Sequence, residues 1–193
     1  MDFCIRLASL EDIPKLTTLI PDSARALQVG YYSSEQIEGA LGIVFGVDTQ
    51  LILDQTYFVA QNNHQIVGCG GWSKRKTLYG GDSGKNNPED RLLNPDSDSA
   101  KIRAFFVHPA WARRGIGSQI MRVCELAAAR AGFKEVEMIA TLAGEPFYTK
   151  FDYQVIERFE ISLPNSHFLP VVPMFKSFGR SPQNTRHNKI SFA

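Results

Sequence analysis

Apolar and polar residues recur along the chain with two different periods, one typical of strands and the other typical of helices. Apolar alternation and short β-rich runs predict strands at residues 3–7, 56–60, 65–72, 101–107, 136–140, 154–163 and 169–176. Apolar positions at helical spacing predict helices at residues 9–20, 34–45, 115–131 and 145–150. We expect the first helix to end at Pro21, because proline lacks the amide proton that the helical ladder needs. The chain therefore reads as a mixed protein in which both kinds of element are short.

Two segments lack either period. Residues 74–99 are rich in Gly, Asn, Asp, Ser and Pro, and predict a loop of about 25 residues that is either disordered or functional. From about residue 177 the chain is polar and unpatterned, so we expect a flexible tail. Since there is no internal repeat, we predict one domain over residues 1–176 followed by a tail over residues 177–193.

Composition excludes several broad classes but names no function. Of the 193 residues, 44% are hydrophobic and 21% are charged, which is typical of a globular protein. Lysine and arginine number 21 against 20 acidic residues, so a broadly basic nucleic-acid binder is not expected. The N-terminal segment lacks the basic end and apolar run of a signal peptide, and no apolar stretch is long enough to span a membrane. We therefore expect a cytoplasmic protein with no nucleic-acid or membrane partner.

The cysteines and histidines do not form a recognisable metal or disulfide pattern. The chain has an odd number of cysteines, Cys4, Cys69 and Cys124, and no two of them form a CxxC pair. The four histidines are scattered along the chain, without HxxxH or HExxH spacing. The sequence therefore predicts no metal site.

The sharpest chemical signal lies between the strand at 101–107 and the helix that follows it. This segment contains, in order, Arg113, Arg114, Gly115, Ile116, Gly117 and Ser118. Glycines at a helix start let backbone amides approach a ligand, and the helix dipole favours negative charge there. With two arginines ahead of them, these amides predict a pyrophosphate cradle. The alternative is a tight turn whose glycines only permit helix–strand packing.

Other nucleotide-binding motifs are incomplete in this chain. A P-loop requires Ser or Thr after the lysine of its GK pair, whereas Asn86 follows Gly84-Lys85. A dinucleotide fingerprint starting at Gly115 requires glycine at position 120, which is occupied by Ile120. A nucleotide-dependent enzyme of another class is therefore not favoured.

Two segments together resemble the GNAT acyltransferases. VHPAWARRGIGSQIM resembles the family's acetyl-CoA signature, in which [QR]xxGx[GA] follows a strand ending in V-x-P. ATLAGEPFYTKFDYQ is similar to the family's short helix carrying Phe-Tyr before a Gly-Phe strand entry. The chain departs from the pattern at Ala112, which occupies the [QR] position, and at Asp152, where glycine is usual.

This resemblance implies an α+β layered fold over residues 1–176, with a mixed, mostly antiparallel central sheet flanked by helices. The implied order is strand, two helices, three strands, helix, strand, helix and two strands. It also implies an acetyl-CoA-dependent N-acetyltransferase, in which the acetyl group passes directly to a primary amine of a small molecule or peptide in a ternary complex. Because relatives often dimerise, a homodimer is a further expectation.

The resemblance assigns roles to particular residues. Backbone groups of Phe105, Phe106 and Val107 would pair with the pantetheine arm of the cofactor, and the amide near Val107 would polarise the thioester carbonyl. The segment Arg113 to Ser118 would hold the pyrophosphate. Thr141 stands where relatives often place an Asn that contacts the cofactor arm, and Tyr148 would be the general acid toward the CoA thiolate.

The general base is left open by the sequence. The strand at 101–107 carries no carboxylate, and Val136 stands where some relatives have Glu. Glu137 is adjacent, but alternation along a strand turns it to the other face. A water relay is one interpretation. The second is a non-catalytic sensor that keeps the acyl-CoA cradle and transfers nothing.

Overall fold

The strands form one sheet in the order β1-β2-β3-β4-β5-β8-β6, with β7 paired to β8, in a computed structural model that describes residues 3–84 and 91–179. The strands are β1 (Cys4–Leu7), β2 (Tyr57–Asn62), β3 (Gln65–Ser73), β4 (Ala100–Val107), β5 (Glu135–Thr141), β6 (Gln154–Val155), β7 (Phe159–Ser162) and β8 (Phe168–Ser177). Neighbouring strands run antiparallel except for β4 and β5, which are parallel. The predicted fold class, a mostly antiparallel sheet flanked by helices, is confirmed.

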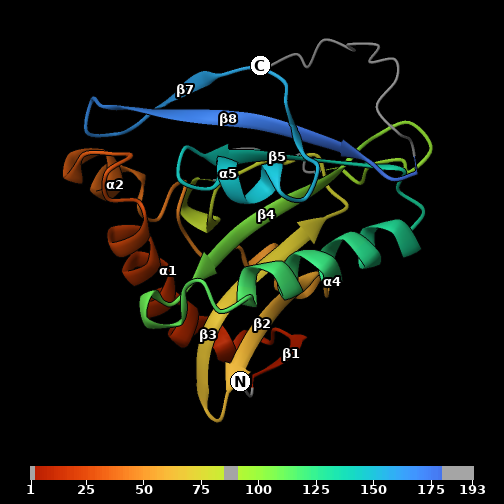
Figure 1. The fold of residues 1–193 in the computed structure, drawn as a ribbon, viewed down its shortest axis with the longest axis horizontal. Helices are drawn as coiled ribbons and strands as arrows, with labels where there is room; N and C mark the ends of the chain where they lie inside the picture. Colours follow the sequence, from red (N-terminus) through yellow and green to blue (C-terminus); the bar gives the residue numbers. More distant parts are fainter. Residues whose placement is uncertain (1–2, 85–90, 180–193) are drawn as a thin grey trace.

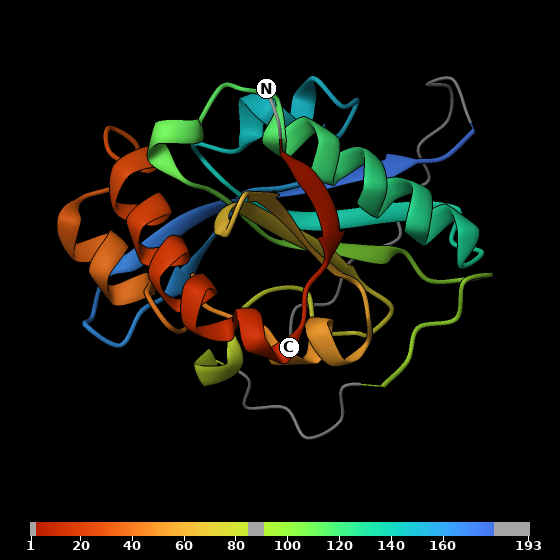
Figure 2. The ribbon, with the colours of Figure 1, turned by 90° about the horizontal axis from the view of Figure 1, so that it is seen from below.

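Helices cover both faces of the sheet, as Figure 2 shows. They are α1 (Ile13–Leu27), α2 (Ser34–Ala40), α3 (Thr49–Leu53), α4 (Ile116–Arg130) and α5 (Glu145–Thr149). The first three pack in one hydrophobic cluster and α4 packs in another. Because side chains alternate along β4, Phe106 contacts the first cluster and Phe105 the second. The two faces of β4 therefore pack in different hydrophobic clusters.

Strands β4 and β5 are paired at one end only. Their register joins Ala100 to Val136 and Lys101 to Glu137, and it goes no further. Lys101 and Glu137 also form an ion pair at this closed end. Beyond it the two strands diverge, as Figure 1 shows on the side of α1 and α2.

A bulge in β4 begins where the divergence begins. Ala104 has a positive φ of 55°, and the β3–β4 register shifts between Cys69 and Gly71. The carbonyl oxygen of Ala104 accepts a hydrogen bond from the hydroxyl of the fully buried Tyr57 at 3.0 Å. A bulge bends the strand that carries it, so this one turns the end of β4 away from β5.

Three predicted element boundaries were wrong. α1 does not end at Pro21 but continues to Leu27, because the buried face that includes Ile20 and Ala24 keeps packing on the sheet. The predicted helix at 34–45 ends at Ala40, since the chain then turns through Gly42, whose φ is 79°. The predicted strand at 154–163 is divided between β6 and β7.

The two segments without periodicity are only partly described. In the 74–99 segment the described residues include a short 3-10 turn at Asp82–Gly84 and a bridge between Arg75 and Leu92. β8 extends to Ser177, the first residue of the predicted tail. The tail from residue 180 onward and the loop residues 85–90 lie outside the described residues.

Candidate active site

The predicted cradle, residues 113–118, forms the entrance to α4. Gly115 is the N-cap of this 15-residue helix, with a φ of 84°, and Arg113 also has a positive φ of 64°. No side chain caps the helix, so its first amides remain available for a ligand. A Cβ added at Gly115 would meet nothing within 4 Å, so the turn opens outward.

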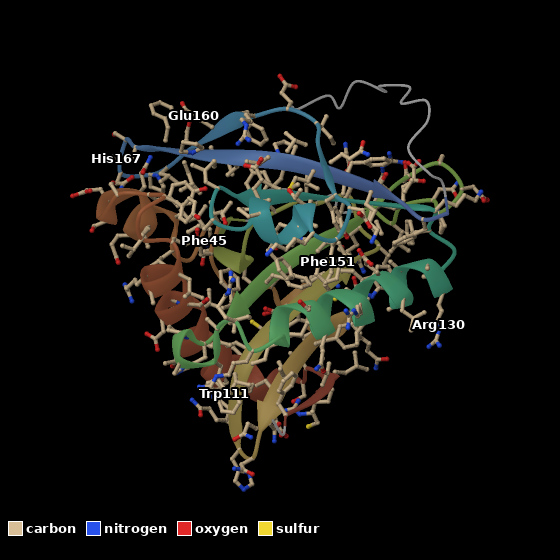
Figure 3. The ribbon with its side chains drawn as sticks, in the orientation of Figure 1. Phe45, Trp111, Arg130, Phe151, Glu160 and His167 are labelled. Atoms are coloured by element: carbon tan, nitrogen blue, oxygen red, sulfur yellow. The ribbon has the colours of Figure 1, made fainter. Side chains whose placement is uncertain are left out.

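Both arginines of the cradle are exposed. The Arg114 guanidinium lies 5.1 Å from the centre of the Trp111 ring, and Trp111 marks the turn before α4 in Figure 3. Neither Arg113 nor Arg114 forms an ion pair with a residue of the described ranges. Two uncompensated positive charges beside unpaired amides suit a doubly charged anion.

Gly117 connects the cradle to α5. A Cβ at this position would lie 3.4 Å from Cζ of Phe147 and 4.0 Å from Cγ2 of Val107. Ile116 is buried against the sheet, whereas Ser118 is half-buried. The cradle, the end of β4 and the Phe-Tyr helix therefore meet at one place, although they are separated in the sequence.

Backbone groups at the end of β4 face two directions. The amide of His108 donates to Val67 on β3 at 3.0 Å, so alternation directs the backbone of Phe106 toward β3 as well. The backbone groups of Phe105 and Val107 then face the opening between β4 and β5. Of the three residues predicted to pair with a pantetheine arm, these two therefore have their backbone groups toward the opening, and Phe106 has its backbone groups toward β3.

The amide of Val107 already has a partner in this structure. It donates to Oγ of Ser23, on α1, at 3.2 Å. Ser23 is only 4% exposed, and the two residues are 84 positions apart in the chain. The sequence contained no signal for this contact.

Tyr148 lies in the same opening, on α5. Its ring packs edge to face on Phe105 and Tyr153, with centroids 6.3 Å and 6.0 Å away. Burial raises the pKa of the Tyr148 phenol above its ordinary value, and its hydroxyl makes no hydrogen bond with the described residues. A protonated phenol without a partner is a suitable proton donor. Thr141 lines the same cleft and accepts a hydrogen bond from the Gly144 amide at 3.1 Å.

A cleft of about 80 Å³ opens where β4 and β5 diverge. Its described lining residues are Gln28, Val44, Phe45, Gly46, Leu78, Tyr79, Gly80, Ile102, Arg103, Ala104, Phe105, Phe106, Met138, Ile139, Thr141, Tyr148 and Val171. Figure 3 shows Phe45 between α2 and the strands at this end of the sheet. The segments 28, 44–46 and 78–80 were not predicted to belong to the site, because only the folded chain brings them to Tyr148.

The described lining contains no carboxylate and no histidine. Glu137, the nearest candidate base in the sequence, is instead ion-paired with Lys101 at the closed end of the split. Arg103, the one charged residue among the described lining residues, pairs with Asp48 at 2.8 Å, and both side chains are almost fully buried. A general base is therefore not found among the described residues of the cleft.

A larger, open depression of about 760 Å³ lies between α1 and the β2–β3 hairpin. It is lined by residues that include Lys15, His64 and His108, and it shares no lining residue with the cleft beside Tyr148. We take the smaller cleft as the candidate active site, because it adjoins the diverging ends of β4 and β5 and the Phe-Tyr helix α5.

Two further observations concern the described residues alone. No three His, Cys, Asp or Glu side chains among residues 3–84 and 91–179 are grouped so that they could hold a metal ion. In the same ranges, no helix has the length and apolar character needed to cross a membrane.

A family model described as an acetyltransferase (GNAT) domain matches residues 54–155, just over half of the chain. The matched range begins before β2 and ends with β6, so it contains the cradle, the split strands and Tyr148. No protein in the curated set is significantly similar to the chain in sequence.

Solved structures share the fold over nearly the whole chain. A GCN5-related N-acetyltransferase from Rhodopseudomonas palustris is 19% identical, with a TM-score of 0.69 over 92% of this chain and 97% of that one. The PaiA N-acetyltransferase from Thermoplasma acidophilum, in complex with coenzyme A, is 16% identical, with a TM-score of 0.62 over 92% and 100% of the two chains. A GNAT family acetyltransferase from Brucella melitensis, in complex with acetyl-CoA, is 17% identical, with a TM-score of 0.56 over 95% and 94%.

Proposed function

Because the chain belongs to the GNAT family of acetyltransferases, we propose that it transfers an acetyl group from acetyl-CoA to a primary amine of a small molecule or peptide. The observation that carries this proposal is the meeting of three features at one opening. These are the cradle at the start of α4, the diverging ends of β4 and β5, and the hydroxyl of Tyr148, which has no hydrogen-bond partner among the described residues.

The residues present fit the cofactor. The open turn at Gly115 leaves space for a pyrophosphate, with Arg113 and Arg114 beside it. The backbone of Phe105 and the carbonyl group of Val107 offer an extended pantetheine arm a strand edge that is not paired with β5, whereas the Val107 amide is bonded to Oγ of Ser23. Thr141 lies on the opposite strand. PaiA from Thermoplasma acidophilum and the Brucella melitensis acetyltransferase have the same fold and were solved with coenzyme A and acetyl-CoA, respectively.

When bound, acetyl-CoA supplies the acetyl group as a thioester, whose thiolate has a pKa of about 8.5 and leaves without a covalent protein intermediate. One β4 amide, that of Phe105 or that of Val107 after it releases Oγ of Ser23, would donate a hydrogen bond to the acetyl carbonyl oxygen as negative charge develops on it. Such donors contribute about 3–4 kcal/mol. Tyr148 would give its proton to the sulfur as the C–S bond breaks and the N–C bond forms.

The proton of the amine needs another acceptor. An amine with a pKa near 10 is only about 0.1% neutral at pH 7, which costs about 4 kcal/mol. Since the described lining of the cleft holds no carboxylate or histidine, we propose that this proton passes to water and that solvent later returns a proton to Tyr148.

The role of Tyr148 is tested by Tyr148→Phe. We expect turnover to fall by about 100-fold, because the departing thiolate loses its acid, while the Kd for acetyl-CoA stays within about twofold. Isothermal titration measures the affinity, and release of free CoA measures turnover. Tyr153→Phe is a matched control, because its ring contacts Tyr148 but its hydroxyl bonds to Sδ of Met121 at 3.6 Å. Equal turnover in both variants would refute the assignment.

A non-catalytic acyl-CoA sensor is the second candidate, and the cleft without a base favours it. It predicts tight acetyl-CoA binding without release of free CoA for any amine of a broad panel. Failure to bind acetyl-CoA at millimolar concentration would overturn both candidates.

A further inference from the structure

Part of the cleft lining comes from segments outside β4, β5 and α5, the elements proposed to hold the cofactor. We call Gln28, Phe45, Leu78 and Tyr79, which lie in these other segments, the wall of the cleft. An acceptor that reaches the acetyl group would contact these residues. The chemistry of their side chains therefore limits which acceptors the cleft can bind.

Most of this wall is apolar. Phe45 packs edge to face on Phe106, with ring centroids 6.2 Å apart, and Leu78 and Val44 line the same side. An acceptor with several positive charges would leave water here without finding an anionic partner among the described lining residues. An aliphatic or aromatic body would instead gain about 25 cal/mol for each Å² of apolar surface that it buries.

The charge of Arg103, which also lines the cleft, is neutralised by Asp48. Arg103 and Asp48 are 2.8 Å apart, with side-chain exposures of 3% and 0%. Arg103 also donates to the carbonyl oxygen of Gly80 at 2.7 Å. Because the Asp48 carboxylate and the Gly80 carbonyl occupy this guanidinium, an acceptor carboxylate would have no uncommitted cation among the described lining residues.

Residues 78–82, which we call the lid segment, are fixed in place over the cleft. The amides of Gly81 and Asp82 donate to the carbonyl oxygens of Ile43 and Val47, each at 2.8 Å. The carboxylate of Asp82 accepts from the amide of Thr49 at 2.9 Å. The apolar wall is therefore a preformed surface rather than a loop that an acceptor must order.

Gln28 and Tyr79 bring polar groups to this otherwise apolar wall. Oε1 of Gln28 is buried and has no hydrogen-bond partner among the described residues. Leaving such an acceptor unpaired costs about 1–3 kcal/mol, which an incoming N–H group would recover. Gln28 is also the C-cap of the 15-residue helix α1, where the helix dipole favours a positive charge. Both features suit an ammonium group or a neutral amine.

We propose that the acceptor is a primary amine whose only charge is its own ammonium group, carried on an aliphatic or aromatic body, and that Gln28 Oε1 binds its nitrogen. This inference rests on the proposed function, because it concerns the acceptor of the same transfer. It selects simple alkylamines and arylalkylamines over polyamines, aminoglycosides, basic peptides and amino acids.

The test compares matched amines with the wild-type chain. 2-Phenylethylamine and phenylalanine differ by a carboxylate, and hexylamine and 1,6-diaminohexane differ by a second ammonium group. We expect kcat/KM, measured by release of free CoA, to be at least about tenfold higher for the first member of each pair, a difference of about 1.4 kcal/mol. Equal or reversed values would overturn the inference while leaving the acetyltransferase proposal intact. Absence of acetyl-CoA binding would overturn both.

Gln28 is tested separately by Gln28→Leu. We expect KM for hexylamine to rise by about tenfold, with the Kd for acetyl-CoA within about twofold, because only the amine contact is removed. Gln154→Leu, on the exposed edge strand β6, is a matched control that should change neither value. An unchanged KM in Gln28→Leu, or an equal weakening of acetyl-CoA binding, would overturn the proposed role.

Discussion

Tyr148 determines the expected pH dependence at high pH. At lower pH the rate depends on deprotonation of the amine, because the described residues of the cleft include no carboxylate or histidine. Burial raises the pKa of Tyr148 above about 10, so its phenol stays protonated, and able to donate, through pH 9. The amine must lose its own proton to water. We therefore expect kcat/KM for hexylamine to rise about tenfold per pH unit from pH 7 to 9 and to level off near the pKa of the amine.

A pH–rate profile measured by CoA release checks this expectation. A plateau that begins near pH 6 or 7 would contradict it, because that plateau would report a protein base with a pKa in that range. A decrease between pH 8 and 9 would contradict the raised pKa of Tyr148 in turn.

Local spacing predicted that residues 113–118 lie at the start of a helix, and the structure places them at the start of α4; their role as a pyrophosphate cradle stays a prediction. That prediction rests on two arginines and two glycines within six positions. Gln28 and Ser23 were missed because their partners come from distant parts of the chain, such as Val107, 84 positions from Ser23. No local pattern distinguishes a glutamine that lines a cleft from one at the end of a solvated helix.

At the scale of elements, α4 lies close to β3 because β3 has glycines where the helix crosses it. A Cβ at Gly68 would lie 2.6 Å from Cγ2 of Ile116, and one at Gly70 would lie 2.8 Å from the Phe105 ring and 2.9 Å from Cγ2 of Ile120. The sequence places these glycines inside the strand predicted at residues 65–72, without a signal for this packing. The structure gives them a packing role that also sets the position of the cradle.

Gly70→Ala tests this packing. We expect the free energy of unfolding to fall by about 1–3 kcal/mol, because the Phe105 ring and Ile120 must move to admit the methyl group. Because Phe105 lies on the strand edge proposed for the pantetheine arm, the Kd for acetyl-CoA should rise as well. Urea unfolding and isothermal titration measure the two effects. A stability loss below about 0.5 kcal/mol would contradict the close approach.

Element types were predicted well, but their ends were not. Tertiary packing carries α1 through Pro21, although local propensity favours an end there. The five-residue helix α3 was missed because a single turn shows no apolar period. The bulge at Ala104 has no sequence signal, because alanine rarely adopts a positive φ.

At the scale of the whole molecule, the sheet consists of two halves. Strands β1 to β4 pair consecutively, and β5 pairs along its length with β8, whereas β4 and β5 share only two register pairs. The family resemblance predicted the mostly antiparallel sheet and the order of its elements, apart from α3 and the division of the predicted strand at 154–163 into β6 and β7. The depth of the split depends on the bulge and on the ion pair between Lys101 and Glu137, neither of which the sequence shows.

A ligand that lies between the halves should stabilise the whole fold. At about 100 times its Kd, acetyl-CoA should add about 2.7 kcal/mol, which corresponds to a rise in Tm of about 5–10 °C for a chain of this size. Adenosine 5′-diphosphate at the same concentration should raise Tm less, because it offers a pyrophosphate to the cradle but no arm to the split.

Hydrogen exchange separates the two regions. Acetyl-CoA should protect the amide of Phe105 together with those of residues 115–118, whereas adenosine 5′-diphosphate should protect only residues 115–118. The amide of Val107 is already bonded to Oγ of Ser23 and is not used as a reporter. Equal protection of β4 by both compounds would place the stabilising contact at the cradle alone. That result would also contradict a binding site between β4 and β5, because adenosine 5′-diphosphate has no pantetheine arm that could contact these strands.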